Sequence, residues 1–400
     1  MAAVEIDPIH SAAHLYNFPE CVTLCADVTT LKGADIVQKV GRPIDVVVGG
    51  APCQGFSLIG QRALDDPRNE LISHFLRLVL ELKPSYFVLE NVKGLTLGKH
   101  KQFLDEIQVE FEKAGYRITL PWKVLNARDY GVPQDRQRLF LMGARAGLAL
   151  PQYPSPQTPK VTCKDALDDL PDIEAYKSLA TSDSVRFKPK SKLSAYAREM
   201  RRVDDSAWRY GYKRDWENSI LTSSTRTVHS EISRRRFEET SPGKIEPISR
   251  FFKLAPDGVS NTLRAGTDSA RGAFTSPRPI HYKYNRCISV REMARLHGFP
   301  DWFRFHSTKW HGARQIGNAV PPPLARAVAE SIMIAMGVRP VRPKRILSLG
   351  GDELLNVDMK TAAARWKISV PIGKRDKKSG AKKRRQRDIE ALRERDAVNA

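Results

Sequence analysis

Short apolar runs alternate with longer segments of helical periodicity over residues 1–150 of the chain. The β-branched run at residues 44–48 and the apolar run at 86–89 predict two buried strands. Residues 70–82 and 102–114 place apolar side chains at a spacing near that of a helix turn, which predicts amphipathic helices. Strands that alternate with helices in this way are typical of a doubly wound, Rossmann-like α/β sheet.

The pattern changes after this region. Residues 151–183 begin with a proline-rich stretch and continue as a short helical linker. Between residues 184 and 285 the periodicity fades, while charged residues, Gly, Ser and Thr accumulate. Residues 286–337 end in an amphipathic helix at 324–336. Residues 338–400 are typical of a basic, partly disordered tail that holds DNA non-specifically, with a nuclear import signal as the alternative.

Basic residues are concentrated in the second half of the chain. The 400 residues include 66 Lys and Arg against 45 Asp and Glu, a net charge of +21. Residues 1–184 hold 20 basic and 23 acidic residues, whereas residues 185–400 hold 46 and 22. Because Lys and Arg contacts to phosphate supply most non-specific affinity for nucleic acids, the second half favours a nucleic-acid partner.

Three segments carry candidate chemistry near predicted strand ends. Cys53 lies in a Gly- and Pro-rich loop after the strand at 44–48, where open α/β sheets bind their ligands. Glu90 ends the second apolar run, and Arg136 and Arg138 share one side of an extended segment because they are two residues apart. Taken singly, each has an ordinary alternative: a buried structural cysteine, a helix-entry carboxylate or surface arginines.

In this order, and with these flanks, the segments resemble the DNA cytosine-5 methyltransferase family of bacterial type. The resemblance continues in segments 124–130, 291–300 and 315–322. Each motif is short, but six of them follow the family order over residues 1–335. The resemblance implies a cofactor and catalytic domain at 1–150, a target recognition domain at 184–285 and C-terminal motifs at 286–337 that pack back on the first domain.

The resemblance also implies covalent catalysis on cytosine. The thiolate of Cys53 would add to C6 of the ring, so that C5 can take a methyl group. Glu90 would hold the N3 and N4 edge of the base, and Arg138 would donate to O2 with Arg136 close by. The base would be flipped out of the duplex into this pocket. Residues 57–71 would close over it, with a plain surface loop as the alternative.

The methyl donor implied by the resemblance is S-adenosylmethionine. Glu5 would accept from its ribose hydroxyls, as strand-end carboxylates do in dinucleotide folds, and Asp27 from the adenine amino group. The cofactor-binding residues implied in this way are Glu5, Ile6, Asp27, Pro52, Leu71 and Asn318. The family's first motif, a strand and a Gly-rich loop, should precede Glu5, where this sequence has residues 1–4. We expect the true start to lie upstream, with a second chain or weakened cofactor binding as alternatives.

The expected partner is double-stranded DNA, bound by a monomer in the cytoplasm at the nucleoid. The resemblance assigns DNA contacts to Gln54, Ser57, Thr262 and Arg264, and a restriction endonuclease that acts on the same site is a further expected partner. The five cysteines show neither a disulfide framework nor structural-zinc spacing, so no metal site is expected. Neither a signal peptide nor a membrane span is expected.

Two alternative functions differ in class from a DNA methyltransferase. The first is a tRNA cytosine methyltransferase, but that branch carries a Cys-Phe-Thr element that this sequence lacks. The second is a DNA-binding relative without activity. An inactive site would have no reason to keep Cys53, Glu90, Arg136 and Arg138 together, which argues against that alternative.

Overall fold

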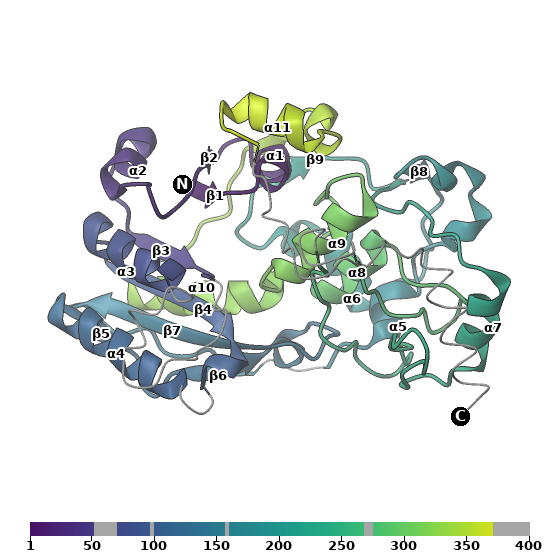
Figure 1. Cartoon of the computed structure of the whole chain (residues 1–400), viewed down its shortest axis with the longest axis horizontal. Helices are drawn as coiled ribbons and strands as arrows, with labels where there is room; N and C mark the ends of the chain where they lie inside the picture. Colours follow the sequence, from purple (N-terminus) through teal and green to yellow (C-terminus); the bar gives the residue numbers. More distant parts are fainter. Residues whose placement is uncertain (52–69, 97–99, 157–159, 268–274, 371–400) are drawn as a thin grey trace, which may run out of the picture.

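The structure is a computed structural model that describes residues 1–51, 70–96, 100–156, 160–267 and 275–370. A sheet with its helices lies at the left of Figure 1, and a more irregular part, residues 163–318, lies mainly at the right. In chain order the elements are β1 (Ala2–Glu5), α1 (Pro8–Asn17), β2 (Val22–Cys25), α2 (Gly33–Val40), β3 (Val46–Gly49), α3 (Glu70–Leu82), β4 (Tyr86–Val92), η3 (Lys93–Thr96), α4 (His100–Lys113), β5 (Tyr116–Ile118), β6 (Lys123–Asn126), η4 (Ala127–Tyr130), β7 (Gln137–Arg145), α5 (Cys163–Leu167), η5 (Ile173–Ala175), η6 (Lys177–Ala180), β8 (Val185–Arg186), α6 (Ala195–Met200), η7 (Asp205–Trp208), β9 (Lys213–Asp215), β10 (Ile220–Leu221), α7 (Glu231–Glu239), α8 (Val290–His297), α9 (Lys309–Asn318), α10 (Pro322–Ala335), β11 (Ile346–Ser348), η9 (Asp352–Leu355) and α11 (Met359–Trp366).

The main sheet is mixed. Within the described residues its strand order is β3-β4-β7-β5, and β6 also pairs with β7. β3 and β4 run parallel, whereas β7 runs antiparallel to β4, β5 and β6. α3 spans Glu70–Leu82, as the helical spacing predicts, and α4 covers most of the predicted segment 102–114.

Helices cover both faces of this sheet. α3 and α4 pack on one face, where Phe75 and Phe111 contact Phe87 of β4. α10 packs on the other face, where Leu324 shares a buried cluster with Tyr86. Neighbouring residues of β4 point to opposite faces, so Tyr86 and Phe87 belong to different cores. The two covered faces confirm the predicted α/β class.

β1 and β2 form a separate parallel pair. α1 follows β1 and begins at Pro8 because the Asp7 side chain accepts the N–H groups of Ile9 and His10. Within the described residues, β1 pairs with β2 and β3 pairs with β4, so β1 and β3 each have one edge without a partner strand. Val48 of β3 is correspondingly 70% exposed.

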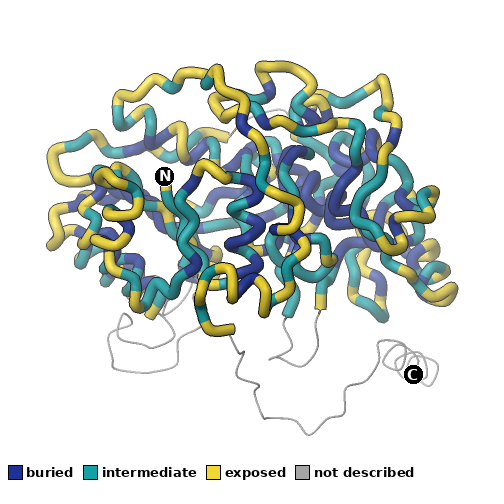
Figure 2. The backbone as a smooth tube through the Cα atoms, turned by 90° about the horizontal axis from the view of Figure 1, so that it is seen from above, coloured by how far each residue is buried: buried dark blue, intermediate teal, exposed yellow. Residues whose placement is uncertain are grey.

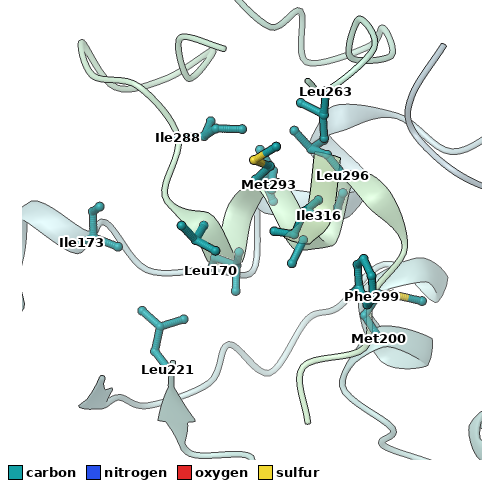
Figure 3. Packing of buried hydrophobic residues seen from close by; sticks show 14 of the residues in the cluster. Leu170, Ile173, Met200, Leu221, Leu263, Ile288, Met293, Leu296, Phe299 and Ile316 are labelled. Carbon is teal, nitrogen blue, oxygen red and sulfur yellow. The ribbon is translucent and has the colours of Figure 1, made fainter. Parts of the chain in front are cut away.

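The irregular part has a core of its own around α8, every residue of which is buried. Leu170, Met200, Leu263 and Ile316 meet there, although they lie far apart in the sequence (Figure 3). Segment 163–180, expected as a linker, supplies part of this core and therefore belongs to the folded body. Figure 2 shows buried backbone in the interior of the molecule and exposed residues along its periphery.

Part of the predicted tail at residues 338–400 is folded, since residues 346–366 contain β11, η9 and α11. β11 pairs in parallel with β9, and η9 and α11 pack against α1. Leu354 and Leu355 share a buried cluster with Tyr16 of α1. The basic run itself falls within residues 371–400, outside the described residues. Among the described residues, every helix is too short or too polar to span a bilayer.

Candidate active site

Glu90 and Arg138 form a partly buried ion pair on two neighbouring strands. Glu90 of β4 lies opposite Phe140 of β7, so Arg138, two residues away, is its diagonal neighbour on the same face. The distance from Nε of Arg138 to Oε1 of Glu90 is 3.0 Å, and their side chains are 15% and 14% exposed. The structure thus brings together two of the four predicted catalytic residues.

The surroundings of the pair shift both acid–base equilibria. Burial raises the pKa of Glu90 above its ordinary value, although the positive charges of Arg138 and Arg136 oppose this. Burial also lowers the pKa of Arg138, which the charge of Glu90 opposes. A carboxyl group with a raised pKa keeps its proton closer to neutral pH. Glu90 is therefore suited to share a proton with a bound ring nitrogen.

The chain that leads to Cys53 passes beside Glu90. A Cβ added to Gly50 would lie 3.1 Å from Oε2 of Glu90, so the backbone comes close to the carboxylate. The side-chain amide of Asn91 donates to the carbonyl of Ala51 at 2.9 Å and fixes the start of this loop. No role was predicted for Asn91. Its position directly after Glu90 is the sequence feature that could have indicated one. Cys53 lies outside the described residues, as do Pro52, Gln54 and Ser57.

Arg136 does not join the ion pair. Its side chain is 1% exposed, and its guanidinium donates to three backbone carbonyls. Nη1 donates to Leu263 at 2.9 Å, and Nη2 donates to Gly317 at 2.7 Å and to Ala319 at 3.0 Å. Burial lowers the pKa of Arg136 to about 9, so the group stays charged at neutral pH. Arg136 thus contacts the backbone, and Arg138 contacts Glu90.

Glu5 and Asp27 lie at the carboxyl ends of the adjacent parallel strands β1 and β2. Glu5 pairs in register with Cys25, two residues before Asp27. Oε1 of Glu5 accepts the N–H of Asp7, and Oδ1 of Asp27 accepts the N–H of Thr29, both at 2.9 Å. Within the described residues, the other oxygen of each carboxylate accepts no hydrogen bond. Two open acceptors at adjacent strand ends fit the hydroxyl and amino groups of an adenosine.

The other predicted binding residues come from scattered elements. Ile6 follows β1 and is 54% exposed, Leu71 lies in the first turn of α3, and Asn318 is the exposed last residue of α9. The hydroxyl of Thr262 donates to the carbonyl of Asp135 at 2.7 Å, whereas Arg264 is exposed. Among these residues, Asn318 and Arg264 present polar groups to solvent.

Comparison with known proteins decides the family. The model of C-5 cytosine-specific DNA methylases matches residues 1–333. The chain belongs to this family. It is therefore a DNA cytosine methyltransferase, and the α/β sheet described above is its methyltransferase fold.

Two relatives in the family match most of the chain. The Type II methyltransferase M.XorII of Xanthomonas oryzae pv. oryzae is 55% identical over 375 residues, which cover 93% of this chain and 88% of that protein. The Type II methyltransferase M1.HphI of Haemophilus parahaemolyticus is 32% identical over 342 residues, covering 83% and 80%.

Solved structures agree with this assignment. A prophage-encoded protein of E. coli, described as a DNA modification methyltransferase, is 34% identical, with a TM-score of 0.69 over 84% of this chain and 92% of that chain. The Dnmt2 methyltransferase of S. pombe is 14% identical, with a TM-score of 0.50 over 84% and 91%. The second likeness shows the fold alone.

Proposed function

We propose that the protein transfers a methyl group from S-adenosylmethionine to C5 of a cytosine flipped out of a specific duplex DNA sequence. The partly buried Glu90–Arg138 pair, beside the loop that leads to Cys53, carries this proposal. A flipped cytosine presents an amino group that needs an acceptor and a carbonyl oxygen that needs a donor. Glu90 supplies the acceptor, and Arg138 supplies the donor.

In this proposal Cys53 is the nucleophile. Its thiolate adds to C6, forms a C6–S bond and moves the electron pair of the C5–C6 double bond toward C5. Glu90 supports protonation at N3, while Arg138 donates to O2, where negative charge develops. C5 would then take the methyl group as the S–CH3 bond of the sulfonium donor breaks, which leaves the donor as a neutral thioether. When a base such as water removes the C5 proton, the double bond re-forms and the C6–S bond breaks, which releases the thiolate.

The positive charge of Arg138 has a second effect. A guanidinium near a cysteine favours the thiolate over the thiol, because it stabilises the negative charge. Asn91 anchors the loop two residues before Cys53, and Glu90 is the adjacent residue of β4. The anchor holds Ala51, the second residue before Cys53, at the residue that follows Glu90.

S-adenosylmethionine would supply a methyl group made electrophilic by a positively charged sulfur. Glu5 would hold its ribose and Asp27 its adenine amino group, since each carboxylate has an oxygen that accepts nothing within the described residues. Asn318 would contact its methionine end. Leu71 would pack near the adenine, with Ile6 and Pro52 completing the site.

The test is methyl transfer from labelled S-adenosylmethionine to mixed-sequence duplex DNA. We expect label on cytosine with the wild type, none with Cys53→Ala, and nearly normal DNA affinity for Cys53→Ser. Cys21→Ala, which removes a buried thiol elsewhere in the chain, is the matched control and should retain transfer. Full activity of Cys53→Ala would overturn the covalent mechanism, and label on tRNA but not on DNA would overturn the choice of substrate.

We further propose that the protein acts as a monomer and protects one DNA sequence from a restriction endonuclease. The Type II names of the relatives support the part of this proposal that concerns protection from an endonuclease. Sequencing of methylated cytosines in DNA modified by the protein tests the proposal. One recognised sequence is expected, and label spread over unrelated sequences would contradict it.

A further inference from the structure

Gln134, Arg136 and Arg138 occur at every second position, so they leave one side of an extended segment. Arg138 pairs with Glu90, whereas the other two side chains hold Leu263. The side-chain oxygen of Gln134 accepts the N–H of Leu263 at 3.0 Å, and Nη1 of Arg136 donates to its carbonyl at 2.9 Å. Both peptide groups of Leu263 are therefore bound by two side chains of the catalytic domain.

Leu263 connects the hydrogen bonds from Gln134 and Arg136 to a buried core and to its two neighbours in the sequence. Its side chain is 1% exposed and lies in the core with Leu296 and Ile316 (Figure 3). Its neighbours are Thr262 and Arg264, the two predicted DNA contacts that lie within the described residues. Leu263 thus holds a DNA-contacting segment, which we define as residues 262–264.

The second target of Arg136 is the carboxyl end of α9. The carbonyls of Gly317 and Ala319, which accept from Nη2, flank Asn318, the predicted cofactor residue. A cation at the carboxyl end of a helix is stabilised by the unpaired carbonyls and the helix dipole. One guanidinium therefore binds the carbonyls of the two residues that flank Asn318.

The two targets of Arg136 also touch each other. A Cβ added to Gly317 would lie 2.3 Å from the backbone nitrogen of Ala265, so the close approach requires glycine. The end of α9 therefore packs backbone to backbone against the residue that follows the DNA-contacting segment. A shift of either element would press directly on the other.

His297 completes this arrangement. Its Nδ1 faces the amide nitrogen of Gln134 at 3.0 Å, and its Nε2 faces the carbonyl of Ala319 at 3.0 Å. Burial, followed by the positive charge of Arg136, lowers the pKa of His297 well below its usual value, so the ring is neutral. A neutral ring with its proton on Nε2 satisfies both contacts, since it accepts from Gln134 and donates to Ala319.

Arg136 has no carboxylate partner within 4.0 Å among the described residues. Its hydrogen bonds go to backbone carbonyls, and the negative charge of Glu90 acts on it only from a longer distance. A buried charge held in this way is expensive, and an apolar side chain would fill the same space without that penalty. An apolar side chain would not, however, form hydrogen bonds to both Leu263 and the end of α9, as the guanidinium of Arg136 does.

We propose that Arg136 is a positioning residue that couples the DNA-contacting segment to the cofactor-contacting end of α9, so that DNA and the methyl donor strengthen each other's binding. This inference rests on the proposed function and deepens it, because it assigns Arg136 to positioning and leaves the base contact to Arg138. DNA that orders residues 262–264 also orders the residues around Asn318, because they share Arg136. Such coupling is reciprocal by thermodynamic necessity.

The test measures binding, without turnover. The affinity of S-adenosylhomocysteine, the demethylated donor, is measured by calorimetry with and without duplex DNA, at a temperature where every variant is folded. We expect DNA to tighten this affinity in the wild type by a factor on the order of 5 to 150, the usual range of such coupling. Arg136→Met should abolish most of that factor, and Arg136→Lys should retain part of it, because one ammonium group replaces a fork of donors.

Arg291→Lys is the matched control. Arg291 is equally buried and donates to the carbonyls of Pro300 and Phe303, but it contacts neither residues 262–264 nor Asn318. We expect this variant to melt at a lower temperature and to keep the coupling. Coupling that survives in Arg136→Met, or that disappears equally in Arg291→Lys, would overturn the inference.

The binding test separates this inference from the proposed function. A wild-type protein that shows coupling lost in Arg136→Met, but transfers no methyl group, would support the inference and contradict the proposed transfer. A wild-type protein that transfers methyl groups without coupling would support the proposed function and overturn the inference.

Discussion

Two Arg–Glu pairs in this molecule use the same residue types in opposite ways. Arg286 donates to both oxygens of Glu292 at 2.8 Å, and the N–H of Ser289 adds a third bond at 2.6 Å. Arg138 approaches Glu90 through Nε at 3.0 Å, and no other side chain described in the structure forms an ion pair with that carboxylate. The side chains of the Arg138–Glu90 pair are 15% and 14% exposed, against 2% each for Arg286 and Glu292. The two pairs also differ in the number of donors that reach the carboxylate.

The pKa values of the two carboxyl groups follow this difference. Burial would raise the pKa of Glu292, but Arg286 overcomes that effect and holds it at about 2. Burial prevails at Glu90, whose pKa is raised despite the charges of Arg138 and Arg136. A carboxylate saturated with donors is a fixed structural anion, whereas one with an open oxygen can receive a base and a proton.

The largest effect is expected when the structural pair is broken. Arg286→Met would leave Glu292 charged and unpaired in the core, so we expect it to lower the free energy of unfolding by about 3–5 kcal/mol. Urea unfolding measures this loss. Arg186→Met, which removes an exposed partner of Glu217, should cost far less, because solvent screens exposed ion pairs, and it serves as the control. Equal losses in the two variants would contradict the structural role of Arg286.

Breaking the Glu90–Arg138 pair should affect turnover instead, if the proposed function holds. Arg138→Met removes a donor aimed at developing charge, and we expect kcat to fall roughly 10²–10³-fold, as for oxyanion-hole donors. Steady-state transfer assays measure this fall, and urea unfolding should show a smaller loss of stability than for Arg286→Met. A variant that loses stability as severely as Arg286→Met, with its turnover intact, would reverse the two assignments.

The pH dependences of the two pairs should also have opposite signs. Glu292 has a depressed pKa, so its contribution to stability is present above about pH 4.5 and is lost as the pH falls toward about 2. Glu90 has a raised pKa, so its protonated form disappears as the pH rises through a value above 4.5. We expect kcat to decline as the pH rises through this pKa. In Glu90→Gln this decline should be absent. If kcat still declined over the same pH range in Glu90→Gln, the titration would belong to another group.

The sequence predicts the Glu90–Arg138 pair better than the Arg286–Glu292 pair. Helical spacing predicts α3, short apolar runs predict β3 and β4, and residues at strand ends such as Glu90 follow from them. The contacts of Arg136 are different in kind, because Leu263 lies 127 residues away and Gly317 lies 181 residues away. Local spacing predicts the side that Arg136 faces, but the partner on that side depends on the packing of α8 and α9. Three-residue strands such as β9 and β11 likewise have too few residues to show a period.

The smallest effect, and the sharpest comparison, is expected from replacing each glutamate by its neutral isostere. Glu292→Gln loses charge-assisted bonds to Arg286, so we expect a loss of about 1.5–3 kcal/mol at pH 7. Glu90→Gln removes a charge whose burial is unfavourable, so its stability should stay within about 1 kcal/mol of the wild type, or rise, even though transfer declines. Urea unfolding of both variants at pH 7 measures the difference. If the two substitutions lowered stability equally, donor number would not explain why one carboxylate is structural and the other is open to substrate.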